Sequence, residues 1–412
     1  MGIEIVDIIE GLVRGPEERL LCLSARPRLD AEARRRLHAL LAGGIDWARA
    51  VALATSNKVM PLVHATLRAE AEAAVPPLVL DELKTRFEAN ARFNLRLSTE
   101  LVRVVRALHG SGVRVLPLKG PVLAQTLYGN LALRQFSDLD VLTPRADYPR
   151  ALATVTSMGY RLVRPAADVG PRETEALMRF FGDYTYTFVH PASGVTLEVH
   201  WGLSPRDRFI PVAEAGFWER LGFATLAGET VPTMAGAELF RYLCVHGAKD
   251  SWKRLSWLCD LAAFMRRNAA MDWADALERA RREGSLRMAL LGASLAHHLL
   301  DAPLPEAFDA PLRAEAPALR RLIPRVRLFH EHPTALGWRD VRFHMGVRRG
   351  MLAKGRALLD YTVVPRFSTF EGVRLPTPLF PLYFALRPAE LFTRRLLRKS
   401  FARLPGAPPP EA

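Results

Sequence analysis

The stretch that decides the fold covers residues 116–142 and reads LPLKGPVLAQTLYGNLALRQFSDLDVL. It ends with two aspartates, Asp138 and Asp140, inside an apolar run that is typical of a buried strand. Because successive side chains of a strand point to opposite faces, both carboxylates are expected on one face and Leu139 on the other. Two carboxylates at this spacing repel each other unless a cation lies between them.

The aspartate pair predicts a magnesium site. Mg²⁺ takes oxygen ligands, keeps several waters, and combines one or two carboxylates with substrate phosphates. In phosphoryl chemistry one metal ion lowers the pKa of the attacking hydroxyl and a second stabilises the leaving diphosphate. A D-x-D pattern by itself is short, however, and solvated acids at the edge of a strand explain it more often than a metal site does.

The residues before the aspartates favour phosphate binding. Lys119 and Gly120 form a turn before a short helix, where a backbone without Cβ can approach phosphates and the helix offers free N–H donors. Arg134 precedes Asp138 by four residues and is expected to reach the same cleft. These three residues are candidate nucleotide-binding residues.

Glu198 is the candidate third carboxylate. It lies in the middle of VTLEVHW (195–201), an apolar strand-like run, and His200 follows on the same face. A carboxylate from an adjacent strand would complete a metal cage with the aspartate pair. Two alternatives stay open. Glu198 can be an acid that faces water, and His200 can orient Glu198 or the acceptor hydroxyl, or be a satisfied interior histidine.

The apolar pattern predicts an α+β fold. Residues 1–109 are expected to be helical, and their last helix, from about residue 80, ends at Gly110 and Gly112. The expected strands lie at 113–118, 138–143, 160–165, 184–190 and 195–201, with helices at 121–129 and 146–160. This order predicts a small mixed sheet, with helices on either side of it in the chain.

Four regions follow from this pattern. They are a helical N-terminal region (1–109), an α/β core (110–232), a helical domain (233–330) and a basic, proline-punctuated C-terminal region (331–412). Within the helical domain, Lys249 of the segment HGAKDSWKRLSWLCD (246–260) is a candidate for holding a phosphate. Trp252 either stacks on a base or, as tryptophans more often do, anchors a core.

The net charge of +14 is concentrated near the C-terminus. Residues 331–412 hold 14 Lys/Arg against 6 Asp/Glu, whereas residues 101–232 hold 14 against 12. The charge therefore says little about the chemistry of the α/β core. The basic C-terminal region is expected to be a solvated tail that packs onto the body, and peripheral contact with anionic surfaces is the alternative.

Cysteine use and the N-terminal sequence predict a cytoplasmic protein. Cys22, Cys244 and Cys259 fit neither a zinc site nor a disulfide framework, and they suit a reducing compartment. The N-terminal MGIEIVDIIEGLVRG carries acids where a secretory signal would be basic. No uncharged window reaches the length of about 18 residues that a membrane span needs.

Taken together, these residues resemble a known family. The stretch 116–142, the helix ending in Gly-Tyr after it, LEVHW and HGAKDSWKRLSWLCDLA are similar to segments of the uncharacterised nucleotidyltransferase family, over about residues 40–270. The resemblance implies the polymerase-β-like nucleotidyltransferase fold. It also implies that Asp138, Asp140 and Glu198 are metal ligands and that Gly120 occupies the phosphate-facing turn.

The chain departs from the wider superfamily at that turn. The superfamily places a Gly-Ser or Gly-Gly pair closer to its D-x-D, whereas this chain has Lys-Gly, and Gly120 precedes Asp138 by 18 positions. No serine hydroxyl is therefore available to hold a triphosphate. Lys119 or Arg134 would have to make that contact.

The leading hypothesis is a nucleotidyltransferase that uses two Mg²⁺ ions. It would transfer NMP from an NTP to an acceptor and release pyrophosphate, with Glu198 near the acceptor. Asp140→Ala is expected to abolish turnover without disturbing the fold. Because the core lacks strong positive charge and no known nucleic-acid-reading motif is present, a small-molecule, glycan or peptide acceptor is preferred over nucleic acid. The alternative is a non-catalytic protein that uses the same fold to bind a nucleotide or a partner.

Overall fold

The centre of the molecule is a five-stranded mixed sheet. The computed structural model describes residues 3–166, 169–205, 209–213, 216–329 and 338–401, with only the backbone course at 3–4, 338–339 and 394–401. The strands are β1 (Leu116–Pro117), β2 (Asp138–Leu142), β3 (Arg161–Arg164), β4 (Thr185–Val189) and β5 (Thr196–His200). They lie in the order β1-β2-β5-β4-β3. The expected α+β class is confirmed.

The pairing of β2 with β5 brings distant segments of the chain together. These two strands are parallel, whereas β1 pairs antiparallel with β2, and β4 pairs antiparallel with both β5 and β3. In the β2–β5 register, Asp140 lies opposite Glu198, Asp138 opposite Thr196, and Leu142 opposite His200. Because opposed residues of paired strands point to the same face, the acidic positions of both strands lie on one face of the sheet.

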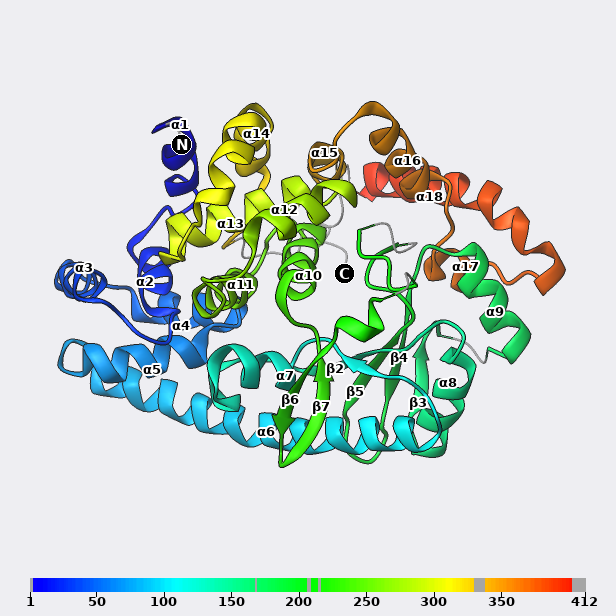
Figure 1. Ribbon diagram of the computed structural model, residues 1–412, viewed down its shortest axis with the longest axis horizontal. Coiled ribbons are helices and arrows are strands. Elements are labelled where there is room, and N and C mark those ends of the chain that lie inside the picture. Colours follow the sequence, from blue (N-terminus) through cyan, green and yellow to red (C-terminus); the bar gives the residue numbers. More distant parts are fainter. Residues whose placement is uncertain (1–2, 167–168, 206–208, 214–215, 330–337, 402–412) are drawn as a thin grey trace.

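The other face of the sheet packs on two helices. These are α6 (Pro77–Gly110) and α8 (Tyr148–Ser157). Leu139 and Val141 of β2, together with the β5 residues opposite them, pack in a core with the C-terminal half of α6. The hydroxyl of Tyr148 donates a hydrogen bond of 3.0 Å to the carbonyl of Val199. Figure 1 shows α6 running across the lower part of the view alongside the strands.

Helices from both ends of the chain form the second core. The helices before α6 are α1 (Ile3–Glu10), α2 (Pro16–Ser24), α3 (Ala31–Ala42), α4 (Trp47–Ser56) and α5 (Met60–Glu70). Those after the sheet are α10 (Gly236–Lys249), α11 (Leu255–Arg267), α12 (Trp273–Arg282), α13 (Leu286–Leu300) and α14 (Asp309–Leu322). Both sets share one core, which Leu116 and Leu142 join from the sheet. The expected helices at both ends are confirmed.

The C-terminal region is folded rather than a solvated tail. It contains α15 (Trp338–Gly346), α16 (Met351–Thr362), α17 (Phe367–Gly372) and α18 (Tyr383–Phe401), and its residues 331–337 and 402–412 lie outside the described part of the chain. The N–H of Phe367 donates a hydrogen bond of 2.9 Å to the Asp183 carboxylate, and Phe181 packs among rings of α17 and α18. The expectation that this region packs onto the body holds, but through helices.

Three elements differ from the sequence predictions. Strand β1 has only two residues of the expected 113–118. Helix α9 (Pro171–Phe180) and a hairpin of β6 (Gly222–Leu226) and β7 (Glu229–Thr233) were not predicted. The apolar side of α9 packs beside the C-terminal helices, at the right of Figure 1, so its position depends on contacts far away in the chain.

The remaining expectations concern cysteines and membrane spans. Cys22, Cys244 and Cys259 are all buried free thiols. Burial raises the pKa of Cys22 to about 12, which is the behaviour of a structural rather than a reactive thiol. None of the described helices combines the length and the apolar character needed to cross a membrane.

Candidate functional site

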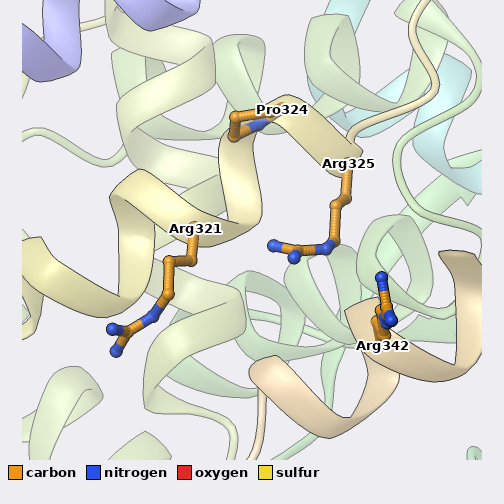
Figure 2. Close-up of a pocket in the computed structure, with 4 residues that line it drawn as sticks. All are labelled: Arg321, Pro324, Arg325 and Arg342. Atoms are coloured by element: carbon orange, nitrogen blue, oxygen red, sulfur yellow. The ribbon is translucent and has the colours of Figure 1, made fainter.

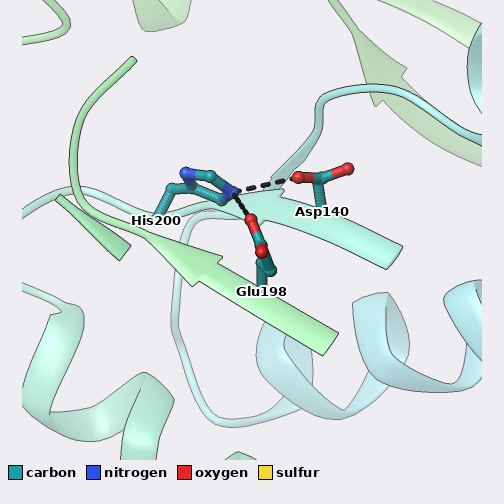
Figure 3. Close-up of side chains that lie close together, drawn as sticks. All are labelled: Asp140, Glu198 and His200. Atoms are coloured by element: carbon teal, nitrogen blue, oxygen red, sulfur yellow. Dashed lines mark hydrogen bonds and ion pairs between the residues drawn. The ribbon is translucent and has the colours of Figure 1, made fainter. Parts of the chain in front are cut away.

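The acidic face of β2 and β5 carries a compact cluster of ligand-type atoms. Asp140, Glu198 and His200 each contribute one atom, and these atoms lie within 4.8 Å of one another. The Nε2 atom of His200 is 3.1 Å from the Asp140 carboxylate and 3.3 Å from the Glu198 carboxylate (Figure 3). Asp140 and His200 are buried, whereas the Glu198 side chain is 29% exposed. The cluster therefore has a closed side at Asp140 and an open side at Glu198.

Lys119 reaches the same carboxylate from the turn after β1. Its Nζ atom lies 3.0 Å from the Asp140 oxygen that also contacts His200. The next residue, Gly120, has φ +57° and ψ −122°, a conformation that side chains with a Cβ rarely adopt, and it begins α7 (Pro121–Leu123). Glycine is thus required at the predicted turn, and the turn directs the lysine side chain toward the carboxylates.

The charges at this cluster depend on one another. Burial alone raises the pKa of Asp140, but Lys119 and His200 outweigh it, so the pKa of this carboxyl lies below its ordinary value. Burial alone lowers the pKa of Lys119, and Asp140 reverses this and raises it. The pKa of His200 is also raised, because Asp140 and Glu198 outweigh its burial. Lys119 and His200 therefore both stabilise the ionised form of the buried Asp140 carboxyl.

Asp138 lies at the start of β2, at the edge of this cluster. Burial raises its pKa, and the nearby Asp140 charge raises it further, against the opposing effects of Lys119 and Lys58. The sequence predicted Asp138, Asp140 and Glu198 as metal ligands. Among the described residues, the side chains close enough to share one ion are instead Asp140, Glu198 and His200. A divalent cation would relieve the mutual repulsion that raises the pKa of Asp138, so the residues present fit such an ion.

Arg134 is engaged elsewhere. Its Nε and Nη2 atoms both donate to the Asp260 carboxylate, with Nη2 at 2.9 Å, and the Tyr128 hydroxyl donates to the same carboxylate at 2.9 Å. Both charged side chains are buried, at 10% and 2% exposure. Sequence reasoning expected Arg134 to face the aspartate cleft. The structure instead gives it a carboxylate partner on α11.

Lys249 lies on the Glu198 side of the sheet. Its Nζ atom is 5.4 Å above the ring of Tyr184, and that ring is 6.0 Å from the ring of His200. Lys249 is exposed, at the last turn of α10. Tyr184 just precedes β4 and has no local sequence pattern that marks it, so sequence reasoning missed this link between Lys249 and the cluster.

Two further basic residues lie on the Asp138 side, and sequence reasoning missed both. Lys58, in the turn between α4 and α5, donates a hydrogen bond of 3.3 Å to the hydroxyl of Ser137. Burial lowers the pKa of Lys58, and the nearby positive charge of Arg254 lowers it further. Lys58 and Arg254 each lie just before a helix and are far apart in the chain, so only the fold reveals that they lie near each other.

Other candidate features lie outside this cluster. Trp252 is completely buried and is therefore a core residue that cannot stack on a base. A separate hollow of about 430 Å³ is formed by α14, α15 and the turn between them (Figure 2). Arg321, Pro324, Arg325 and Arg342 line it, so it contains no carboxylate and shares no residue with the cluster.

Comparison with known proteins gives one match. A family model described as "Uncharacterised nucleotidyltransferase" matches residues 43–301 of the chain. The match covers α4 to α13, the whole five-stranded sheet and the ligand cluster. No curated protein and no solved structure matches the chain.

Proposed function

Because the chain belongs to the uncharacterised nucleotidyltransferase family, we propose that it is a magnesium-dependent nucleotidyltransferase that moves NMP from an NTP to an acceptor and releases pyrophosphate. The observation that carries this proposal is the parallel register that sets Asp140 opposite Glu198. That register brings acids 58 positions apart in the chain onto one sheet face, beside a lysine–glycine turn.

Asp138, Asp140 and Glu198 are the proposed metal ligands. Two Mg²⁺ ions bound there would neutralise charge at the α-phosphate and the leaving diphosphate and lower the pKa of the attacking group. Asp140 is fixed in place by Lys119 and His200. Glu198 lies on the open side of the cluster, where its free carboxylate oxygen can accept the proton of the acceptor group.

The remaining candidate residues have supporting roles in the proposal. Lys119 and Gly120 face the nucleotide phosphates from the turn, and His200 orients Glu198. Lys249, on the same side as Glu198, contacts an anionic group of the nucleotide or the acceptor. Arg134 is proposed to act on the nucleotide only indirectly, because its Nε and Nη2 atoms both donate to Asp260.

The acceptor is proposed to be a small molecule, a glycan or a peptide. The opening at Glu198 is flanked by the ring of Tyr184 and a single lysine, whereas a nucleic-acid acceptor would need a longer cationic track. The buried thiols suit a reducing cytoplasm, which is the proposed location.

The test is pyrophosphate release from each of the four NTPs, with and without Mg²⁺. Mass spectrometry of small-molecule, glycan and peptide pools then identifies the nucleotidylated product. Glu198→Gln should lower the rate by about a hundredfold or more. Glu175→Gln is the matched control, because Glu175 is an exposed acid on α9. Equal rates in Glu198→Gln and the wild type would overturn the assignment.

A second candidate function is supported by the ion pair of Lys119 with Asp140. In a non-catalytic protein that binds a nucleotide or a partner, the Lys119 ammonium would permanently neutralise the Asp140 carboxylate, which would otherwise bind a metal ion. Calorimetry with ATP separates the two functions. Binding that does not depend on Mg²⁺, without pyrophosphate release from any NTP, would favour the binding protein.

A further inference from the structure

Lys58 is held in an unusual backbone conformation beside Asp138. Its φ is +54°, in the left-handed region that non-glycine residues seldom occupy. Its side chain extends from the α4–α5 turn to the hydroxyl of Ser137, the residue immediately before Asp138. Strained conformations of this kind persist where the surrounding structure fixes them, and they are frequent at functional sites.

The residue before Lys58 fixes its position relative to α11. The side-chain oxygen of Asn57 accepts a hydrogen bond of 3.1 Å from the N–H of Leu255, and its backbone carbonyl accepts one of 3.2 Å from the N–H of Ser256. Asn57 therefore caps the first turn of α11 from a segment about 200 residues earlier in the chain. Because Arg254 immediately precedes that turn, the cap sets Lys58 and Arg254 near each other.

These two cations differ from their basic neighbours. Lys253 pairs with Asp250 at 3.3 Å, and Arg134 pairs with Asp260 at 2.9 Å. Within the described part of the chain, Lys58 and Arg254 form no ion pair with a carboxylate. Asp138 is the nearby acid, but it forms no ion pair with either cation. Two partly buried cations that repel each other and lack an ion-pair partner suit the binding of an anion.

The two sides of the cluster carry different charges. Lys58 lies on the Asp138 side with Lys119 and Arg254, and the positive charges of these two neighbours both lower the pKa of Lys58. The β5 side presents Glu198 and the ring of Tyr184, with Lys249 above that ring. A polyphosphate carries more negative charge than an acceptor hydroxyl, so the side with three cations suits the polyphosphate.

We propose that Lys58 and Arg254 form an anion subsite that binds the terminal phosphates of the nucleotide, the part that leaves as pyrophosphate. The acceptor then approaches from the Glu198 side. This inference rests on the proposed function for the identity of its ligand. It adds a polyphosphate subsite built from the N-terminal helices and the start of α11, outside the α/β core.

The test is calorimetric titration of the full-length protein with inorganic tripolyphosphate and, separately, with AMP, both in the presence of Mg²⁺. Lys58→Met and Arg254→Met should each weaken tripolyphosphate binding about tenfold, because each removes a charged contact to phosphate. AMP binding should change less than about twofold, because AMP lacks the terminal phosphates. Lys253→Met is the matched control, and it should bind tripolyphosphate like the wild type because Lys253 already pairs with Asp250.

A second variant separates loss of the subsite from loss of the fold. Lys58→Gly removes the charge at a φ that suits glycine, so it should keep the melting temperature of the wild type or raise it. It should still lose tripolyphosphate binding as Lys58→Met does. Failure of the wild type to bind tripolyphosphate, wild-type binding by Lys58→Gly and Arg254→Met, or an equal loss of AMP binding would each overturn the proposal.

The same data distinguish this proposal from the proposed function. Tripolyphosphate binding that depends on Lys58, without pyrophosphate release from any NTP, would support the subsite and contradict the proposed transferase function. Normal NTP turnover in Lys58→Gly and Arg254→Met, with unchanged tripolyphosphate binding, would contradict the subsite and support the proposed transferase function.

Discussion

At the scale of single residues, Asp140 has a structural role as well as the proposed chemical one. Sequence reasoning expected Asp140→Ala to leave the fold intact, because nothing else required that charge. This expectation does not fit the structure, in which Lys119 and His200 both contact the buried Asp140 carboxylate. Removing one member of a buried pair leaves the other charge without compensation.

Asp140→Asn should therefore lower both activity and stability. We expect turnover to fall by about a thousandfold and the free energy of unfolding to fall by about 3 kcal/mol. Urea denaturation measures the second effect. Glu198→Gln is the comparison, because Glu198 is partly exposed and its loss should cost less than about 0.5 kcal/mol. Equal stability of Asp140→Asn and the wild type would contradict the structural role of this aspartate.

The Arg134–Asp260 pair gives a second prediction at this scale. Asp260→Asn leaves a buried guanidinium without a charged partner, so it should lower the free energy of unfolding by about 3 kcal/mol. Arg134→Met with Asp260→Leu should recover much of that loss, because the double variant removes both buried charges. A chemical denaturation series on the three variants checks the effect, and a double variant less stable than Asp260→Asn would refute it.

Some of these residues could be predicted from the sequence, because the signal that marks them lies in the few residues on either side of each one. Asp138, Asp140 and Glu198 are acids in short apolar strands, and alternation assigns each to a face. Lys58 and Arg254 lie in the short connections before α5 and α11, which show no such contrast. Their proximity follows from hydrogen bonds between segments about 200 residues apart, which no local pattern contains.

At the scale of elements, Trp252 explains how closely α10 and α13 approach each other. The indole is completely buried, and glycines on both helices make room for it. A Cβ on Gly247 would lie 2.3 Å from the indole ring, and one on Gly292 would lie 2.6 Å from it. The two helices can therefore pack on the tryptophan only if both positions lack a side chain.

Gly292→Ala should destabilise the protein by about 1–3 kcal/mol, because the added methyl group overpacks the core between α13 and Trp252. Gly355→Ala is the matched control. Gly355 lies inside α16, where an added Cβ meets no atom within 4 Å, so the change should stabilise the helix by about 0.5–1 kcal/mol. Thermal unfolding of both variants tests the pair, and the packing account fails if both shift the melting temperature in the same direction.

The elements that sequence predicted well have strong local periodicity. The long helix α6 lies close to its expected bounds, α10 to α13 lie within the region 233–330 that was expected to be helical, and β2 and β5 match their expected runs. Strand β1 is shorter than expected, and the β6–β7 hairpin was missed. The hairpin lies beside β1, so both depend on tertiary packing at one edge of the sheet.

At the scale of the whole molecule, a net charge of +14 makes acid pH unfavourable, because each new proton adds to the existing repulsion. Buried histidines add to this effect. Burial lowers the pKa of His344 to about 4, with Arg348 as a further cause. The group binds a proton near pH 6.5 when the chain is unfolded but only near pH 4 when it is folded, so acid favours unfolding.

Stability should therefore fall as the pH drops from about 6.5 toward 4. By pH 5 the contribution of His344 to this loss is about 2 kcal/mol. His344→Gln, which cannot titrate, should lose that much less stability between pH 7.5 and pH 5. Urea denaturation of both proteins at the two pH values measures the difference. Parallel losses in the two proteins would show that His344 does not contribute.

The cap that Asn57 places on α11 has a consequence for anyone who exchanges parts between relatives of this chain. A chimera that transplants only residues 110–232 would carry the acids together with Lys119 but leave behind Lys58 and Arg254, the two cations on the Asp138 side. Its carboxylates would then match a recipient only if the recipient's outer helices had evolved the same counter-charges. Swaps should instead be made in units that keep the α4–α5 turn together with the start of α11.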